Sequence, residues 1–233
     1  TALGAAGVFL LRRTERPCTQ RILCGMAAGI MLAASVWSLL LPAIDRAADQ
    51  PLPAWIPPAV ALVLGAVGLL QLEQAAGALL AGGEGHGGRT VLAVTLHNLP
   101  EGMVTGLAAA LALTGRPDAV SGALALSLGI GLQNIPEGAA VSLPLVHNGR
   151  TRGQAFCAGA ASGLVEPLGA MLAFVLAEWV GAALPWLMSA AAGCMVCVTA
   201  QEMIPQAVEG DEPAGVVSIV LGFALMMALD VAL

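Results

Sequence analysis

A polar hexapeptide occurs twice in this sequence, each time inside a long apolar segment. The first copy, HNLPEG, covers residues 97–102, and the second, QNIPEG, covers residues 133–138. A charged side chain at the centre of a membrane helix costs roughly 2.5–3.5 kcal/mol on insertion scales. A cost that recurs at two matching places needs a compensating partner. The imidazole, amide and carboxylate groups of the two copies indicate that this partner is a cation.

The polar side chains of each copy recur at helical spacing. His97 and Glu101 are four residues apart and therefore share one helix face, as do Gln133 and Glu137. The proline of each copy cannot donate a backbone hydrogen bond, so it frees a carbonyl group and kinks the helix. The glycine that ends each copy allows a neighbouring helix to approach closely.

Four further side chains in the apolar segments extend this candidate metal site. They are the amides Asn98 and Asn134, the carboxylate Glu166 and the thioether Met26. Together with the paired motif they supply one imidazole nitrogen, several oxygens and one sulfur. Such mixed ligation suits Zn²⁺, Fe²⁺ or Mn²⁺ rather than a calcium cage or a thiolate-closed structural zinc site. Incomplete ligation also suits a transported ion, which must be released again.

The composition is that of an integral membrane protein. Of the 233 residues, 58% are hydrophobic and 10% are charged, whereas soluble domains contain about 25% charged residues. Continuous apolar runs favour a helical bundle in the lipid bilayer over a β-barrel. The net charge of −6 argues against nucleic acid as a partner.

The apolar runs and their breakers predict an all-α polytopic bundle of eight transmembrane helices, which forms one domain over residues 1–233. The first run, residues 2–11, is too short to span a bilayer, so we interpret it as the tail of a truncated first helix. The other seven helices are predicted at residues 21–41, 57–80, 90–113, 117–146, 154–180, 184–204 and 214–233. The helix at 21–41 should stop at Pro42. A glycine-rich cytoplasmic loop is expected at about residues 81–89.

The arginines predict the orientation of the bundle. Seven of the nine lie in loops on one side of the membrane, and Arg46 and Arg116 lie on the other. The positive-inside rule places the seven-arginine side in the cytoplasm and the C-terminus outside. The two motif helices then run antiparallel between two outer triplets, a 3+2+3 arrangement with an inverted repeat around a midplane site. No repeat between the outer triplets is evident in the sequence. All nine basic residues are Arg rather than Lys, and together with the excess of Ala and Gly this indicates a bacterial protein of the inner (plasma) membrane.

These features resemble the ZIP family of divalent metal transporters (Zrt-, Irt-like proteins), in its bacterial type. The likeness rests on the two hexapeptides, on Glu166 followed by Pro167, and on the 3+2+3 layout. It implies transport of Zn²⁺, and of Cd²⁺, Fe²⁺ or Mn²⁺, toward the cytoplasm through a binuclear site on the fourth, fifth and sixth helices. The metal would be the substrate, with no catalytic cofactor. Rigid-body alternating access is the mechanism that the inverted pair indicates.

The resemblance also implies a ligand set for each ion. One ion would bind His97, Glu101, Gln133 and Glu137, with Met26 as an additional ligand. The other would bind Asn98, Asn134, Glu137 and Glu166, and Glu101 or Glu137 would bridge the two. Many family members have His where this chain has Gln133, so one nitrogen ligand is missing here.

Several alternatives stay open at this point. Glu202 is either an exit-side ligand or an interfacial acid, and Asp230 either attracts cations at the entrance or is a solvated charge. An intramembrane metalloenzyme is disfavoured because the zinc-binding HExxH pattern is absent, so we expect no enzyme. A transporter of protons or organic substrates is a further alternative, because intramembrane acids also relay protons. The sequence leaves the oligomeric state open, with a homodimer as one alternative.

Overall fold

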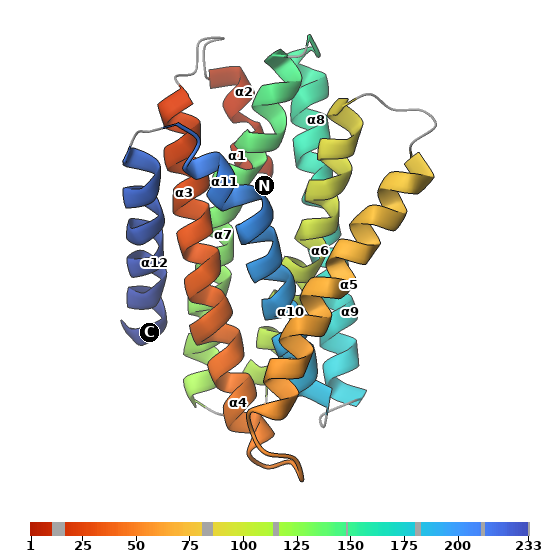
Figure 1. The fold of residues 1–233 in the computed structure, drawn as a ribbon, viewed down its shortest axis with the longest axis vertical. Helices are drawn as coiled ribbons and strands as arrows, with labels where there is room; N and C mark the ends of the chain where they lie inside the picture. The colour runs from red at the N-terminus through yellow and green to blue at the C-terminus, as the bar shows by residue number, and fades with distance from the viewer. Residues whose placement is uncertain are drawn as a thin grey trace.

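The computed structural model describes residues 1–10, 17–80, 86–113, 117–147, 149–179, 183–210 and 213–232, and every long element among them is a helix. Within the helices, some side chains, including that of His97, lie outside the described part. Short helices α1 (Ala2–Ala5) and α2 (Gly7–Leu10) come first in the chain. The long helices that follow pack as one elongated bundle (Figure 1). The predicted all-α bundle is therefore confirmed.

Six helices in the described residues are long and apolar enough to cross a membrane. These spans are Cys18–Ala47, Ile56–Ala75, Ala119–Leu143, Arg152–Leu176, Leu184–Ala207 and Ala214–Ala232. Helix α6 (His86–Ala112), which carries the first motif copy, has 27 residues and lies in the same bundle. The chain is thus polytopic, whereas the count of eight membrane helices and the truncation of the first stay predictions.

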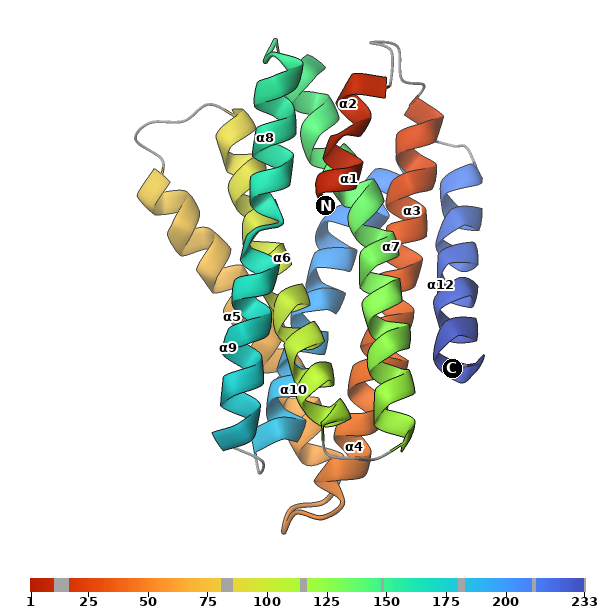
Figure 2. The ribbon, with the colours of Figure 1, turned by 180° about the vertical axis from the view of Figure 1, so that it is seen from behind.

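Four helices have nearly the bounds expected from the sequence. They are α5 (Ile56–Leu80), α6, α7 (Pro117–His147) and α12 (Ala214–Ala232). Helices α6 and α7 run antiparallel, as predicted, and each continues through the proline of its motif (Figures 1 and 2). The predicted glycine-rich loop falls on residues 81–85, which lie outside the described part, and residues 86–89 already belong to α6.

The prediction that a helix ends at Pro42 is wrong. Helix α3 (Pro17–Ala34) passes through a π-helical segment, η1 (Ser35–Leu40), into α4 (Leu41–Ala47). Pro42 is in the first turn of α4 but follows helical residues, so its missing N–H falls inside a continuous helical segment. The wider π turn before it lets the chain continue in the same direction.

A second π-helical segment followed by a proline occurs near the end of the chain. Helix α10 (Leu184–Val198) passes through the π segment η3 (Thr199–Met203) into α11 (Ile204–Ala207), with Pro205 at the start of α11. Each π segment begins with a hydroxyl side chain bonded to the carbonyl four residues earlier. Ser35 Oγ donates to Met31 O at 2.8 Å, and Thr199 Oγ1 donates to Met195 O at 2.7 Å. The two assemblies run in opposite directions (Figure 1), so α3 and α10 are related by an inverted likeness that the sequence did not reveal.

The sixth predicted helix is broken rather than continuous. Helix α8 (Arg152–Ser162) and helix α9 (Val165–Trp179) are separated by a turn at Gly163 and Leu164. Pro167 lies in the first turn of α9, where backbone N–H groups have no partner inside the helix. Glu166 therefore stands at the start of a helix near the middle of the bundle, not in a helix interior.

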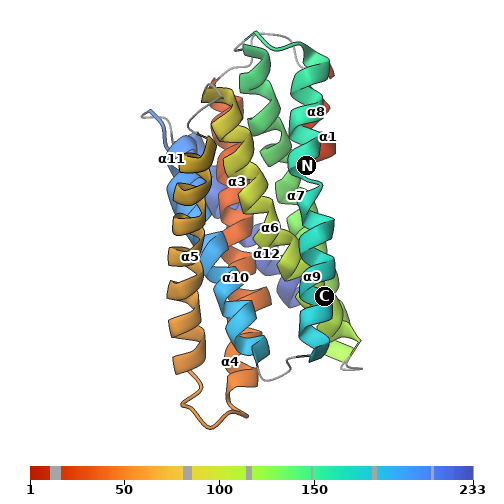
Figure 3. The same ribbon diagram turned by 90° about the vertical axis from the view of Figure 1, so that its right-hand side faces the viewer.

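Four glycines lie at close contacts between pairs of helices. Gly29 of α3 lies against the backbone of α12, and Gly193 of α10 lies against the backbone of α5. Gly102 of α6 faces the backbone of α9, and Gly138 of α7 faces the carbonyl of Thr1, just before α1. The pairs α6–α9 and α5–α10 lie side by side (Figures 2 and 3). We call these four contacts the glycine seams.

Candidate metal site

The polar side chains of the two motif copies are almost completely buried. Exposed fractions are 0% for Asn98, 1% for Glu101 and Gln133, and 5% for Asn134 and Glu137. Helices α6 and α7 hold these side chains in the interior of the bundle, where polar groups cannot be hydrated freely. Each group must therefore find a partner within the protein or a bound ion.

Two amides of α7 hold the carboxylates of the neighbouring helices. Gln133 Nε2 donates to Glu101 Oε1 at 2.8 Å, which links α7 to α6. Asn134 Nδ2 donates to Glu166 Oε2 at 2.8 Å, which links α7 to α9. Because an ionised carboxylate can only accept a hydrogen bond, both amides turn their NH₂ groups toward it and leave their oxygens free.

Five buried oxygens of the motif lack a hydrogen-bond partner. They are Asn98 Oδ1, Glu101 Oε2, Gln133 Oε1, Asn134 Oδ1 and Glu137 Oε2. Seven buried side-chain atoms in the described residues have no partner, so the motif accounts for most of them. Leaving one buried acceptor unsatisfied costs about 1–3 kcal/mol. All five atoms are acceptors, so a partner that bridges them must be a cation or a donor such as a buried water molecule.

The three carboxylates of the site are close enough to interact. Glu101 lies within electrostatic range of Glu137 and Glu166, and Glu137 interacts with Glu166. Like charges in a medium of low dielectric constant repel strongly, and a cation between them converts that repulsion into attraction. The arrangement therefore favours a bound positive ion.

The remaining amide, Asn98, ties the site to the broken helix. Asn98 Nδ2 donates to the carbonyl of Ser162 at 3.0 Å, at the end of α8. Because the helix is interrupted at Gly163, this carbonyl is not needed for a hydrogen bond within a continuous helix and can accept from the Asn98 side chain. The break brings α8 and α9 to the motif and leaves the Asn98 oxygen free.

Of the predicted ligands His97 and Met26, only Met26 has a side chain that the structure describes. His97 belongs to α6, but its side chain is outside the described part. Met26 is partly buried in the apolar core, and its backbone lies against Gly222 of α12. Met31, which the sequence reading overlooked, is 4% exposed, and its sulfur accepts from Thr199 Oγ1 at 3.7 Å. Met31 and Met195 each precede a hydroxyl residue by four positions, and this shared spacing is the sequence pattern that could have indicated Met31.

Among the described side chains, carboxylates alone do not form a metal site. No group of three or more His, Cys, Asp or Glu side chains within the described ranges is arranged to hold a metal ion. A site built on the motif must therefore combine carboxylate oxygens with the amide oxygens of Asn98, Gln133 and Asn134. Carbonyl-type oxygens are weaker ligands than thiolates, which is compatible with an ion that is released.

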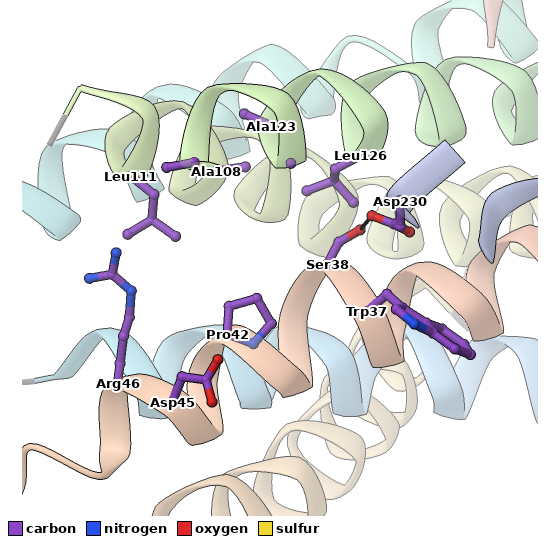
Figure 4. A pocket seen from close by; sticks show the side chains of 12 residues that line it. Trp37, Ser38, Pro42, Asp45, Arg46, Ala108, Leu111, Ala123, Leu126 and Asp230 are labelled. Atoms are coloured by element: carbon purple, nitrogen blue, oxygen red, sulfur yellow. Dashed lines mark hydrogen bonds between the residues drawn. The ribbon is translucent and has the colours of Figure 1, made fainter. Parts of the chain in front are cut away.

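The two predicted pathway acids stand on different sides of the site. Glu202, in η3, is partly buried and interacts electrostatically with Glu137. Asp230, near the end of α12, accepts from Ser38 Oγ at 2.7 Å, and its second oxygen is buried without a partner. Asp230 lines a cavity of about 310 Å³ together with residues of η1, α4, α6 and α7 (Figure 4). That cavity lies toward the α4 end of the bundle, whereas η3 leads to α11 (Figure 1).

Comparison with known proteins identifies the class to which this fold and site belong. The family model of the ZIP zinc transporters matches residues 87–230, which include α7 to α12 and almost all of α6. The chain belongs to the ZIP family, as the paired hexapeptide predicted.

Named relatives agree with this assignment. The chain is 40% identical to the zinc transporter ZIPB of Bordetella bronchiseptica, over the whole chain and 77% of that protein. It is 34% identical to the zinc transporter GufA of Myxococcus xanthus and 32% identical to the zinc transporter ZIP11 of Homo sapiens. Both matches cover the whole chain and 94% of the relative. Because the family and these relatives are named as transporters, the prediction of a transporter rather than an enzyme is confirmed.

Proposed function

We propose that this protein carries Zn²⁺ across a membrane through a site between α6, α7 and α9. The five unpartnered oxygens are the observation that carries the proposal, because they are buried acceptors on two adjacent helices. The relatives' names point to zinc as the substrate. Cd²⁺, Fe²⁺ and Mn²⁺ are further candidates, since oxygen-rich ligation with one imidazole discriminates weakly among them.

The free oxygens divide between two ion positions. The first position takes His97, Glu101, Gln133 and Glu137, and three of these residues supply an unpartnered oxygen. The second takes Asn98, Asn134, Glu137 and Glu166, in which both amide oxygens are unpartnered. Glu137 Oε2 is one of the unpartnered oxygens. We assign Glu137 to both positions, with Glu101 as the alternative bridge.

Support for a thioether ligand at the first position is greater for Met31 than for Met26. Met31 is buried and contacts Thr199, three residues before Glu202, while its own helix leads through η1 to the cavity at Ser38. Met26 lies five residues earlier, which turns its position on the helix by about 140°. There its backbone packs on α12, in keeping with a role in the core.

A route for the ion is suggested by the groups on either side of the site. Asp230 and Ser38 offer oxygens in the cavity at the α4 end, and Glu202 offers a carboxylate toward α11. The arginine distribution places the α4 end outside, so the ion would pass from Asp230 to the binuclear site and then past Glu202 into the cytoplasm. This orientation also puts the C-terminus outside a bacterial inner membrane.

Alternating access by sliding of two helix groups is compatible with the seams. One group would comprise α3, α6, α7 and α10 with their π segments, and the other α1, α5, α8, α9 and α12. Each glycine seam joins a helix of one group to a helix of the other. Backbones that meet without intervening side chains can shift along each other without repacking a core. All of these helices belong to a single transmembrane domain.

Reconstituted protein tests the proposal directly. Proteoliposomes that contain the purified chain should accumulate Zn²⁺, and Glu137→Ala should reduce the flux to near the background of empty vesicles. His97→Ala should reduce it in the same direction. Glu209→Gln, which changes an exposed acid outside the helices, serves as a matched control and should retain flux. Unchanged flux in both site variants would refute the site, and peptide cleavage without flux would revive the enzyme alternative.

A further inference from the structure

Thr1 contacts the proposed second ion position from outside the motif. Thr1 Oγ1 donates to Glu166 Oε1 at 2.6 Å, although the two residues are 165 positions apart in the sequence. The Thr1 hydroxyl makes no hydrogen bond to a backbone N–H of α1 and is directed to the carboxylate.

Two glycines create the space that Thr1 occupies. Gly138, the last residue of the second motif copy, lies against the Thr1 carbonyl. At Gly163, in the turn between α8 and α9, an added Cβ would lie 2.8 Å from Thr1 Cβ and 3.2 Å from Glu166 Oε1. Any larger residue at either position would displace Thr1. The helix break and the motif glycine therefore converge on this one side chain.

Both oxygens of Glu166 are thus held before any ion arrives. Thr1 bonds one oxygen and Asn134 bonds the other, from α1 and α7 respectively. Each oxygen keeps a lone pair, and the two hydrogen bonds fix the direction in which those lone pairs point. Outer-shell partners of this kind commonly orient a metal-binding carboxylate, and their loss weakens metal binding by about 10- to 100-fold.

We propose that Thr1 is a positioning residue that acts through Glu166 and sets the affinity of the second ion position. The inference rests on the proposed function, because it requires Glu166 to bind the ion. Thr1 and Glu166 belong to the same helix group in the sliding mechanism, whereas Asn134 belongs to the other. The Thr1 bond therefore persists while the Asn134 bond breaks, and it keeps Glu166 oriented throughout the movement.

Equilibrium Zn²⁺ binding to the purified full chain in detergent tests this role. Thr1→Val removes the hydroxyl but keeps the shape, and we expect the second ion to bind about 10- to 100-fold more weakly while the first binds normally. Thr1→Ser should restore wild-type binding because it restores the donor. Thr1→Ala, measured in parallel, should behave like Thr1→Val. Thr105→Val is the matched control, since its hydroxyl bonds only the backbone carbonyl of Glu101.

The outcomes separate this inference from the proposed function. Wild-type binding of both ions by Thr1→Val, or equal weakening by Thr1→Val and Thr1→Ser, would overturn the positioning role. Glu166→Gln provides the second comparison. If Glu166→Gln loses the second ion but Thr1→Val does not, only the role of Thr1 fails. If Glu166→Gln binds both ions normally, the second ion position itself is wrong, and the inference fails with it.

Discussion

Gln133 donates its side-chain amide to Glu101 across the contact between α7 and α6, at 2.8 Å. The bond fixes the orientation of both side chains. The remaining oxygen of each, Glu101 Oε2 and Gln133 Oε1, is buried without a hydrogen-bond partner. A residue that has no charge thereby keeps a charged neighbour in place. We therefore expect the metal preference of the proposed first ion position to depend on this pair.

Replacing Gln133 by His should shift the preference toward Zn²⁺ over Mn²⁺. A neutral imidazole can still donate to Glu101 through one nitrogen while the other binds the metal, and nitrogen ligands favour Zn²⁺. We expect Zn²⁺ to gain about tenfold in affinity relative to Mn²⁺, which corresponds to about 1.4 kcal/mol. Competition binding with the two ions measures the ratio. An unchanged ratio would show that Gln133 does not contact the ion.

A methyl group at Gly102 should disrupt the seam between α6 and α9. Gly102 lies against the backbone of Glu166, so the Cβ of Gly102→Ala would force the two helices apart. Overpacking of this kind costs about 1–3 kcal/mol, and both the melting temperature and the Zn²⁺ flux should fall.

Gly131→Ala provides the matched control for that substitution. Gly131 lies on α7, two residues before Gln133, and nothing is within 4 Å of an added Cβ. This variant should be neutral or more stable, because Ala is the better helix former by up to about 1 kcal/mol. Equal melting temperatures for the two alanine variants would contradict the close contact at Gly102.

Zinc should stabilise the folded protein, and acid should remove that effect. An ion at 100 times its Kd adds about 2.7 kcal/mol to the free energy of unfolding. Protons compete for the carboxylates and for His97, so the stabilisation by Zn²⁺ is largest near neutral pH and decreases as the pH falls. Thermal unfolding with Zn²⁺ and with a chelator, across a pH series, measures both effects. A zinc-induced shift that grows in acid would refute ligation by these residues.

Asp230→Asn should slow the capture of metal without changing the central site. Asp230 lines the cavity at the α4 end, where its charge raises the local concentration of cations. The KM for Zn²⁺ should rise by about three- to tenfold at low ionic strength, with kcat little changed, and salt should reduce the difference. Asp49→Asn, an exposed acid at the same end, is the control. A fall in kcat at constant KM would argue against a capture role.

Much of the central site was predictable from the sequence. The burial of Glu101 and Glu137 follows from carboxylates inside apolar segments at matching places, and the pairing of Gln133 with Glu101 follows from two antiparallel helices with like motifs. Helix α7 begins at the predicted Pro117 because proline is favoured in the first turn. Local pattern and helix geometry were sufficient for these features.

Other features could not be predicted from the local sequence pattern. Pro42 was predicted to end a helix, and the helix predicted at 184–204 stopped before Pro205, because a π segment that accommodates a proline leaves no recognisable spacing. The break at Gly163 was missed because a single glycine in an apolar run is equally compatible with close helix packing. The bond between Thr1 and Glu166 joins residues 165 positions apart, and only the folded bundle brings them together.

The three carboxylates of the site also determine how much positive charge a bound ion must supply. When ionised, Glu101, Glu137 and Glu166 carry three negative charges in a region of low dielectric constant. One monovalent cation would leave a net charge of about −2, whereas one divalent ion would leave about −1. Because uncompensated charge is costly to bury, a single bound ion neutralises the site better when it is divalent. The amides that hold these carboxylates are neutral, so the arithmetic is unaffected by them, and the site can select its ion by valence as well as by ligand type.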